Sequence, residues 1–304
     1  MIQRVFVTGA TGYLGSAITA RLVRAGLEVR GLARTPERAI AIEALGARAT
    51  IGEIGRRETY FSALQNCDAV VHAAFDDRGA AAADQSALEA IRAAAQDGRV
   101  RRLLYTSGIW VHGDTAGAVV DETAPLAAAE HVRWRPAHEQ AALDLAGDEV
   151  ATVVFRPGMV YGERRGTFGD WFREAREKHT VTYPGDGAQH WGAVHRDDVA
   201  EAYALALQHA KGGERYLLVD ESRFTVRELA EAVAAATGAR AVASGREALV
   251  RSLGAYGAAL LMDQRFTSAR ARRELGWVPR HTSFVAEAEA LHREWQEAAQ
   301  GAVG

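Results

Sequence analysis

Short apolar stretches rich in Val, Ile and Leu alternate with longer stretches of helical period along the first half of the chain. The alternation predicts six strands, at Arg4–Val7, Glu28–Ala33, Ala47–Ile51, Ala69–His72, Arg102–Thr106 and Thr152–Phe155. It predicts five helices between them, at Tyr13–Ala25, Pro36–Leu45, Thr59–Gln65, Ala80–Asp97 and Pro136–Ala146. Apolar strands linked by helices are typical of a parallel sheet with both faces covered. We therefore expect an α/β fold with a doubly wound parallel sheet of the Rossmann type.

Beyond Gly162 the pattern changes and predicts a second, smaller α/β unit. The expected elements are a helix at Phe168–Glu177, a turn at Pro184-Gly185, a helix from Asp197 and a strand at Arg215–Val219. The remaining C-terminal third is expected to be mostly helical. Thr225 and Glu228 have the spacing of a capping box at the start of a helix over Val226–Ala236, and Gly238 fits its end.

Composition excludes several classes of protein. The chain has 304 residues, of which 48% are hydrophobic and 25% charged, so disorder, collagen and coiled coil are excluded. With 36 basic and 39 acidic residues, the net charge of −3 leaves no basic excess for nucleic acid or an anionic membrane. The run Leu253 to Met262 is too short to span a membrane, and its apolar part is more typical of core than of a pocket wall.

The single cysteine, Cys67, can form neither an internal disulfide nor a cysteine-rich zinc site. The N-terminal residues Met1 to Val5 lead directly into a strand pattern and lack the basic, apolar and cleavage regions of a signal peptide. We expect a cytoplasmic protein that folds in a reducing compartment.

A glycine-rich turn between the first strand and the first helix carries the first functional signal. Gly9 permits the tight turn, Gly12 lets the backbone approach a pyrophosphate, and Gly15 allows close packing of helix on strand. The free N–H groups at the helix N-terminus favour phosphate. This turn in its strand–turn–helix context predicts dinucleotide binding.

The end of the second strand indicates which dinucleotide. An acidic residue there would bind the ribose 2′-hydroxyl of NAD, but the strand ends in Arg34, with Arg38 close by. A guanidinium suits a 2′-phosphate, which it can bind through two charged hydrogen bonds. We expect NADP, with NAD as the alternative.

Several ordered motifs together resemble those of the extended short-chain dehydrogenase/reductases, the NAD(P)-dependent epimerase/dehydratase family. Besides the glycine turn, they are Cys67 to Ala74, Leu103 to Gly108, Arg156 to Gly162, Val194 to Ala200 and Ala269 to Pro279. The resemblance implies strand order 3-2-1-4-5-6-7 and a homodimer. It also implies a dinucleotide-binding domain of residues 1–162 and 191–220 and a substrate domain of residues 163–190 and 221–304.

The resemblance also implies which residues bind the cofactor. The pyrophosphate would be held by Thr8, Gly9, Thr11, Gly12, Tyr13 and Leu14. Arg34 would bind the adenosine ribose phosphate, and Glu53 and Ile54 would flank the adenine. The nicotinamide would lie beside Ala73, Ala74, Pro157 and Val160.

The family's usual Tyr-x-x-x-Lys pair is absent. None of the eight tyrosines has a lysine four residues on, and the only lysines are Lys178 and Lys211. If Glu139 is aligned with the glutamate that commonly follows the family lysine, His131 takes the tyrosine position and Arg135 the lysine position. The spacing of four would then place His131 and Arg135 on one helix face.

A second alignment of the same segment stays open. It pairs Trp134 with His138, in which case only His138 could exchange a proton. We prefer the first alignment, although Pro136 places His131 at the edge of the predicted helix.

Ser107 is the remaining catalytic candidate, because its hydroxyl could polarise a carbonyl, although Gly108 stands where the family often has serine or threonine. His112, Tyr161 and His195 are expected to line the pocket, and no metal-ligand spacing is present. We predict an NADP-dependent oxidoreductase acting on a small carbonyl or alcohol. The alternatives are a non-catalytic NADP-binding sensor or scaffold and a sugar-nucleotide epimerase or dehydratase.

Overall fold

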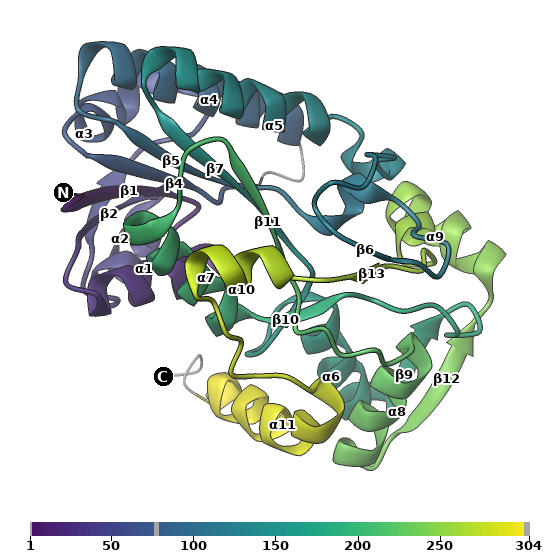
Figure 1. The fold of residues 1–304 in the computed structure, drawn as a ribbon. Helices are drawn as coiled ribbons and strands as arrows, with labels where there is room; N and C mark the ends of the chain where they lie inside the picture. Colours follow the sequence, from purple (N-terminus) through teal and green to yellow (C-terminus); the bar gives the residue numbers. More distant parts are fainter. Residues whose placement is uncertain (1, 76–78, 301–304) are drawn as a thin grey trace.

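A seven-stranded parallel sheet forms the centre of the computed structural model, which describes residues 2–75 and 79–300 (Figure 1). Its strands are β1 (Arg4–Thr8), β2 (Glu28–Ala33), β3 (Arg48–Ile51), β4 (Ala69–His72), β5 (Arg102–Thr106), β7 (Ala151–Pro157) and β11 (Glu214–Leu218). They are arranged as β3-β2-β1-β4-β5-β7-β11. This order confirms the predicted one, with β7 and β11 as the sixth and seventh strands.

The strands bury side chains on both faces of the sheet. In β1, Val5 and Val7 pack on one face and Phe6 on the other, as the period of two requires. The first face is covered by α1 (Tyr13–Arg24), α2 (Pro36–Glu43), α7 (Arg196–His209) and α10 (Ala269–Leu275). The second face is covered by α3 (Phe61–Gln65), α4 (Ala80–Asp97) and α5 (Arg135–Leu143), as Figure 1 shows. The doubly wound prediction is confirmed.

The helix that carries the candidate catalytic residues begins later than the first alignment requires. Helix α5 starts at Arg135 with Pro136 in its first turn, where the missing N–H of proline is tolerated. His131 lies before it, in the 3₁₀ turn η3 (Glu130–Val132). The expectation that His131 and Arg135 share one α-helix is therefore wrong. A 3₁₀ turn η4 (Asp144–Asp148) follows α5, and two others lie earlier, η1 (Arg57–Thr59) and η2 (Ile109–His112).

The C-terminal part of the chain forms most of a second lobe with an aromatic core. Its helices are α6 (Gly166–Lys178), α8 (Val226–Thr237), α9 (Arg246–Ala259) and α11 (Phe284–Gln300). The core includes Phe168, Trp171, Trp191, Phe284 and Trp295. The capping box of Thr225 and Glu228 is present, and Gly238 ends α8 in the left-handed conformation, as predicted.

Three small parallel pairs were not predicted. They are β8 (Met159–Tyr161) with β10 (Ala193–His195), β9 (Thr180–Pro184) with β12 (Arg240–Ser244), and β6 (Val119–Val120) with β13 (Arg265–Phe266). Each strand has five residues or fewer and pairs with a segment distant in sequence, so the local pattern does not mark it. The domain boundaries at residues 162, 190 and 220 stay a prediction.

Helix α9 is broken in its middle. Gly254 has φ 56° and ψ −134°, a backbone conformation that is available almost only to glycine. The residues on either side of it therefore belong to two helical segments that meet at an angle.

A buried ion pair fastens α5 to the central sheet. The guanidinium of Arg156 in β7 donates from Nε and Nη2 to the two carboxylate oxygens of Glu139, at 3.1 and 2.6 Å. Both side chains are at most 2% exposed. Removing one partner would leave the other charge buried without compensation.

We expect Glu139→Gln to lower the free energy of unfolding by about 3–5 kcal/mol, the range for breaking a buried ion pair. Urea unfolding followed by circular dichroism measures it. The matched control is Glu43→Gln at an exposed position of α2, which should stay within about 0.5 kcal/mol of the unsubstituted protein. Equal stability of the two variants would contradict the structural role of the pair.

Candidate functional site

A cleft of about 580 Å³ opens at the carboxyl ends of β1, β2, β4 and β5, where ligands bind in folds of this class. Twelve of the predicted site residues line it: Gly9, Thr11, Gly12, Tyr13, Leu14, Arg34, Ile54, Ala73, Ala74, Ser107, Arg135 and Val160. Six predicted site residues are not among its lining residues: Thr8, Gly15, Glu53, His131, His138 and Pro157.

The glycine turn is packed so closely that side chains are excluded. A Cβ on Gly15 would come within 2.0 Å of the Gly9 carbonyl oxygen, and one on Gly12 within 3.0 Å of the same atom. Gly9 itself has φ +70°, and a Cβ on it would lie 2.6 Å from the Ala73 carbonyl oxygen. Each glycine is thus required by its surroundings. Tyr13 and Leu14 at the start of α1 line the cleft, and the N–H groups of a helix N-terminus favour phosphate.

Four arginines line the cleft and make it suitable for phosphate groups. Arg34 and Arg38 lie beyond the end of β2, and Arg135 comes from α5. Arg165 reaches the glycine turn from the start of α6, where its Nη1 donates to the Thr11 carbonyl at 3.1 Å. Arg165 was not predicted, since nothing in the local sequence indicates that its segment returns to the turn.

The carboxylate of Asp84 in α4 is the centre of a buried hydrogen-bond network. Its Oδ1 lies 3.0 Å from His72 Nε2, and the other ring nitrogen of His72 lies 2.7 Å from Thr8 Oγ1. Its Oδ2 accepts from the Tyr105 hydroxyl at 2.9 Å and lies 2.7 Å from His138 Nδ1. Burial opposes ionisation of Asp84, but the neighbouring His72 and these hydrogen bonds outweigh it and hold the pKa of Asp84 well below its usual range.

Two members of this network, His72 and Asp84, line the cleft, and Thr8 and His138 are bonded to them without lining it. The Thr8 hydroxyl bonds to His72, and His138 is held by Asp84 in the interior, with 14% of its side chain exposed. The sequence does not single out Asp84, because its role depends on contacts between three separate elements.

His131 and Arg135 occupy different surroundings. Arg135 donates from Nη1 to the Thr106 carbonyl at 3.0 Å, and its guanidinium lies over the rings of Trp134 and Phe75. His131 is exposed, and its ring contacts those of Trp110 and Tyr256. Arg135 therefore faces the cleft, while His131 lies at the border with the C-terminal lobe.

Ser107 presents an unpaired hydroxyl in the cleft. The residue is 6% exposed, and its Oγ has no hydrogen-bond partner among the described residues. A buried hydroxyl without a hydrogen-bond partner costs free energy. We therefore expect a ligand oxygen or a water to form a hydrogen bond with Ser107.

The expectation that His112, Tyr161 and His195 line the pocket is wrong for this cleft. All three are at most 4% exposed and pack inside the protein. The Nε2 of His112 lies 3.0 Å from Arg156 Nη1, and Tyr161 donates to Asp220 Oδ2 at 3.3 Å. The ring of His195 stacks on His281 at 3.7 Å between centroids. Burial, with the nearby His281, lowers the pKa of His195 to about 3.

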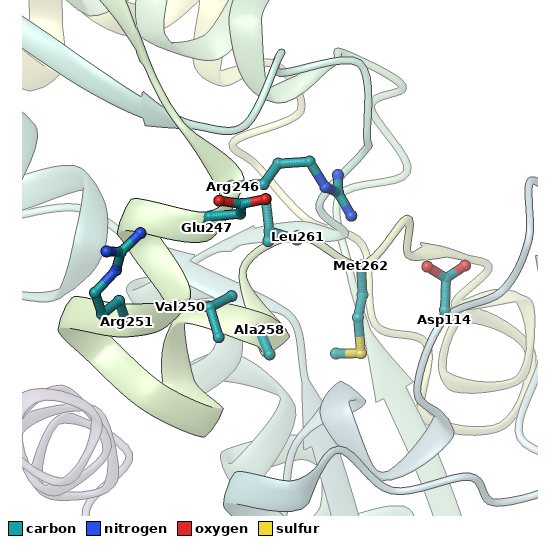
Figure 2. A pocket seen from close by; sticks show the side chains of 8 residues that line it. All are labelled: Asp114, Arg246, Glu247, Val250, Arg251, Ala258, Leu261 and Met262. Carbon is teal, nitrogen blue, oxygen red and sulfur yellow. The ribbon is translucent and has the colours of Figure 1, made fainter.

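A second hollow, of about 690 Å³, lies beside α9, is also lined by Asp114, and shares no residue with the cleft (Figure 2). Arg246, Glu247, Val250 and Arg251 of α9 border it, as Figure 2 shows. Ala258, Leu261 and Met262 also line it, so part of the apolar run predicted as core faces this hollow.

The described ranges 2–75 and 79–300 contain no helix with the length and apolarity needed to cross a membrane. They also contain no group of three or more His, Cys, Asp and Glu side chains placed to bind a metal ion.

Comparisons with known proteins agree with this geometry. The family model described as "NAD dependent epimerase/dehydratase family" matches residues 5–218. The chain is 31% identical to 4-hydroxy-2-methyl-3-oxo-4-farnesyl-3,4-dihydroquinoline-1-oxide ketoreductase of Stigmatella aurantiaca, over 92% of this chain and 93% of that protein. It is 26% identical to 2-alkyl-3-oxoalkanoate reductase of Shewanella oneidensis, over 78% and 67% of the two chains.

The fold is shared with solved structures. A crystal structure of UDP-glucose-4-epimerase from Stenotrophomonas maltophila, with bound NAD and formylated UDP-arabinopyranose, matches with a TM-score of 0.84 and 23% identity. The match covers 99% of this chain and 100% of the other.

The buried carboxyl of Asp220 generates a prediction about pH. Burial raises its pKa to about 6, above the value of about 3.9 expected in the unfolded chain. Because the folded protein binds the Asp220 proton more tightly than the unfolded chain, the protonated carboxyl stabilises the fold below pH 4. This contribution is lost as the pH rises through 6. Asp220→Asn keeps the neutral form at every pH. We therefore expect its stability relative to the unsubstituted protein to rise by about 3 kcal/mol between pH 4 and pH 8.

Urea unfolding at both pH values measures this difference, with Asp170→Asn on the exposed surface of α6 as the control. A pH-independent difference between Asp220→Asn and the unsubstituted protein would show that Asp220 titrates normally.

Proposed function

Because the chain belongs to the NAD dependent epimerase/dehydratase family, we propose that it is an NADP-dependent oxidoreductase that interconverts a carbonyl compound and the corresponding alcohol. Ser107 orients the substrate oxygen, His131 exchanges the proton, and Arg135 holds positive charge beside the nicotinamide ribose. A homodimer and a cytoplasmic location stay predictions.

The unpaired hydroxyl of Ser107 is the observation that carries this proposal. It is buried in the wall of the cofactor cleft, and Arg135 lines the same cleft. A hydroxyl in that position can donate to the oxygen of a carbonyl and stabilise the negative charge that develops during reduction.

The residues of the cleft fit NADP. The glycine turn excludes side chains where a pyrophosphate must approach the backbone, and Arg34 and Arg38 lie beyond β2, where a 2′-phosphate is expected. All six of Thr11, Gly12, Arg165, Ala73, Ala74 and Val160 line the cleft. In this proposal the first three would border the pyrophosphate and the last three the nicotinamide. When bound, the cofactor supplies or accepts the hydride.

His131 suits proton transfer better than His138 because it is exposed at the border of the lobes, with access to solvent. His138 is tied to Asp84 inside the protein.

Two similar proteins are named as reductases of oxo compounds, one a ketoreductase and one an oxoalkanoate reductase. These names favour carbonyl reduction over sugar epimerisation, a reaction that usually depends on the absent tyrosine and lysine.

Cofactor choice is tested by Arg34→Ala. We expect the Kd for NADPH to rise roughly 10- to 100-fold, because a charged hydrogen bond to the 2′-phosphate is lost, while the Kd for NADH changes little. Titration of the nicotinamide fluorescence measures both. Arg24→Ala, at the exposed end of α1, is the control. Equal weakening of both cofactors would contradict the assignment of Arg34.

Catalysis is tested by NADPH oxidation with a panel of ketones and aldehydes. We expect turnover, and we expect His131→Gln to lower kcat about 10²-fold or more with the Kd for NADPH unchanged. The control is His209→Gln at the exposed end of α7.

A normal rate in His131→Gln together with a low rate in His138→Gln would establish the second alignment instead. Tight NADPH binding without turnover of any compound would favour the sensor.

A further inference from the structure

The guanidinium of Arg135 is held in the cleft with one edge unused. The side chain is half-buried and lines the cleft, and its Nη1 donates to the Thr106 carbonyl oxygen at 3.0 Å. Its central carbon lies over the rings of Trp134 and Phe75, at 4.7 and 5.4 Å from the ring centroids. Its Nε and Nη2 have no hydrogen-bond partner among the described residues. These two nitrogens form an edge that can bind a carboxylate through two parallel hydrogen bonds.

No carboxylate of the described residues pairs with this edge. Glu139, one turn further along α5, pairs with Arg156. Asp84 also lines the cleft, but both of its oxygens already lie within hydrogen-bond distance of other side chains, those of His72, Tyr105 and His138. Within residues 2–75 and 79–300 Arg135 forms no ion pair, so its positive charge is available to an anion from outside the chain.

The phosphates expected of the cofactor belong to other parts of the cleft. In the proposed function, the 2′-phosphate lies at Arg34 beyond β2, and the pyrophosphate lies at the glycine turn, where Arg165 is bonded to Thr11. Arg135 is bonded at the end of β5, and β4 separates that strand from β1. The nicotinamide ribose carries no negative charge. The anion that suits Arg135 is therefore expected on the substrate.

The bond to Thr106 places Arg135 beside Ser107. Thr106 and Ser107 share a trans peptide bond, in which the carbonyl oxygen lies about 2.8 Å from the next Cα. Because Nη1 of Arg135 is 3.0 Å from this oxygen, it lies within about 6 Å of the Ser107 Cα. Both side chains line the cleft, and the Ser107 hydroxyl has no partner among the described residues. A cation and an unpaired hydroxyl are thus neighbours at the end of β5.

We propose that the substrate is a short oxo acid, whose carboxylate binds the free edge of Arg135 while its keto oxygen accepts a hydrogen bond from Ser107. The inference rests on the proposed function, because it names the substrate class of the same site. The carbonyl carbon takes up a hydride from NADPH and the oxygen a proton, which yields the hydroxy acid and NADP⁺. The carboxylate is unchanged. Arg135 is then a substrate-binding residue that orients the carbonyl, besides holding positive charge beside the nicotinamide ribose.

Pairs of an oxo acid and its methyl ester, which differ in the charge of one group, test the proposal. The probes are acetoacetate with methyl acetoacetate and pyruvate with methyl pyruvate, assayed by NADPH oxidation. We expect kcat/KM to be about 10- to 100-fold higher for the acid in at least one pair, the range that a charged hydrogen bond provides. Arg135→Gln should bring this ratio close to one. Arg135→Lys, which keeps the charge but loses the pair of parallel donors, should keep part of it.

Arg133→Gln is the matched control, because Arg133 is exposed, pairs with Glu130 and does not line the cleft. It should leave the ratio of acid to ester unchanged. Equal use of acid and ester in both pairs overturns the inference. A preference for the acid that persists in Arg135→Gln also overturns it, since the carboxylate would then be bound elsewhere.

Binding without turnover separates this inference from the proposed function. Saturation-transfer NMR measures the binding of acetoacetate and pyruvate to the complex of the protein with NADP⁺. Binding of either acid that is lost in Arg135→Gln, with no turnover of any carbonyl compound, overturns the proposed function and supports the carboxylate site. Absence of binding of both acids overturns the inference, and turnover of uncharged ketones in that case leaves the proposed function in place.

Discussion

The direct packing of α1 against the glycine turn determines the position of the whole cleft. No side chain fits between Gly15 and the carbonyl oxygen of Gly9, so the first turn of α1 meets the glycine turn through backbone atoms at this point. The same turn presses against Ala73 and Ala74 beyond β4. Because backbone contacts leave no room for side-chain repacking, the ends of β1 and β4 are held at a fixed separation, and the other lining residues are arranged around them.

Two buried contacts, each involving a carboxylate, hold helix α5 in place at neighbouring residues. His138 is bound by Asp84 of α4, and Glu139 by Arg156 of β7. These two contacts fix the rotation of the helix about its axis and its position relative to the sheet. As a result Arg135, one turn earlier, faces the cleft. The first of them belongs to a chain of hydrogen bonds that ends at Thr8, so α5 and the strand end that leads into the glycine turn are joined through the interior.

The central sheet and the glycine turn could be predicted because their signals are local: apolar strands between helices, and three glycines at fixed spacing. The strands of the three small pairs could not, since each depends on a partner distant in the chain. The same limit applies to the site. Arg34 is marked by its place at a strand end, whereas Asp84 and Arg165 reach the cleft through tertiary contacts that no local pattern announces.

The break in α9 gives one residue an influence over the shape of the hollow beside this helix. The angle between the two helical segments is set by a backbone conformation at Gly254 that other residues avoid, and residues that line the hollow lie on both sides of it, Val250 before and Ala258 after. A Cβ at Gly254 would meet no atom within 4 Å, so backbone preference alone opposes a replacement there. The shape of this hollow therefore depends on a single position in α9 and can change without any change in the glycine turn of the cleft.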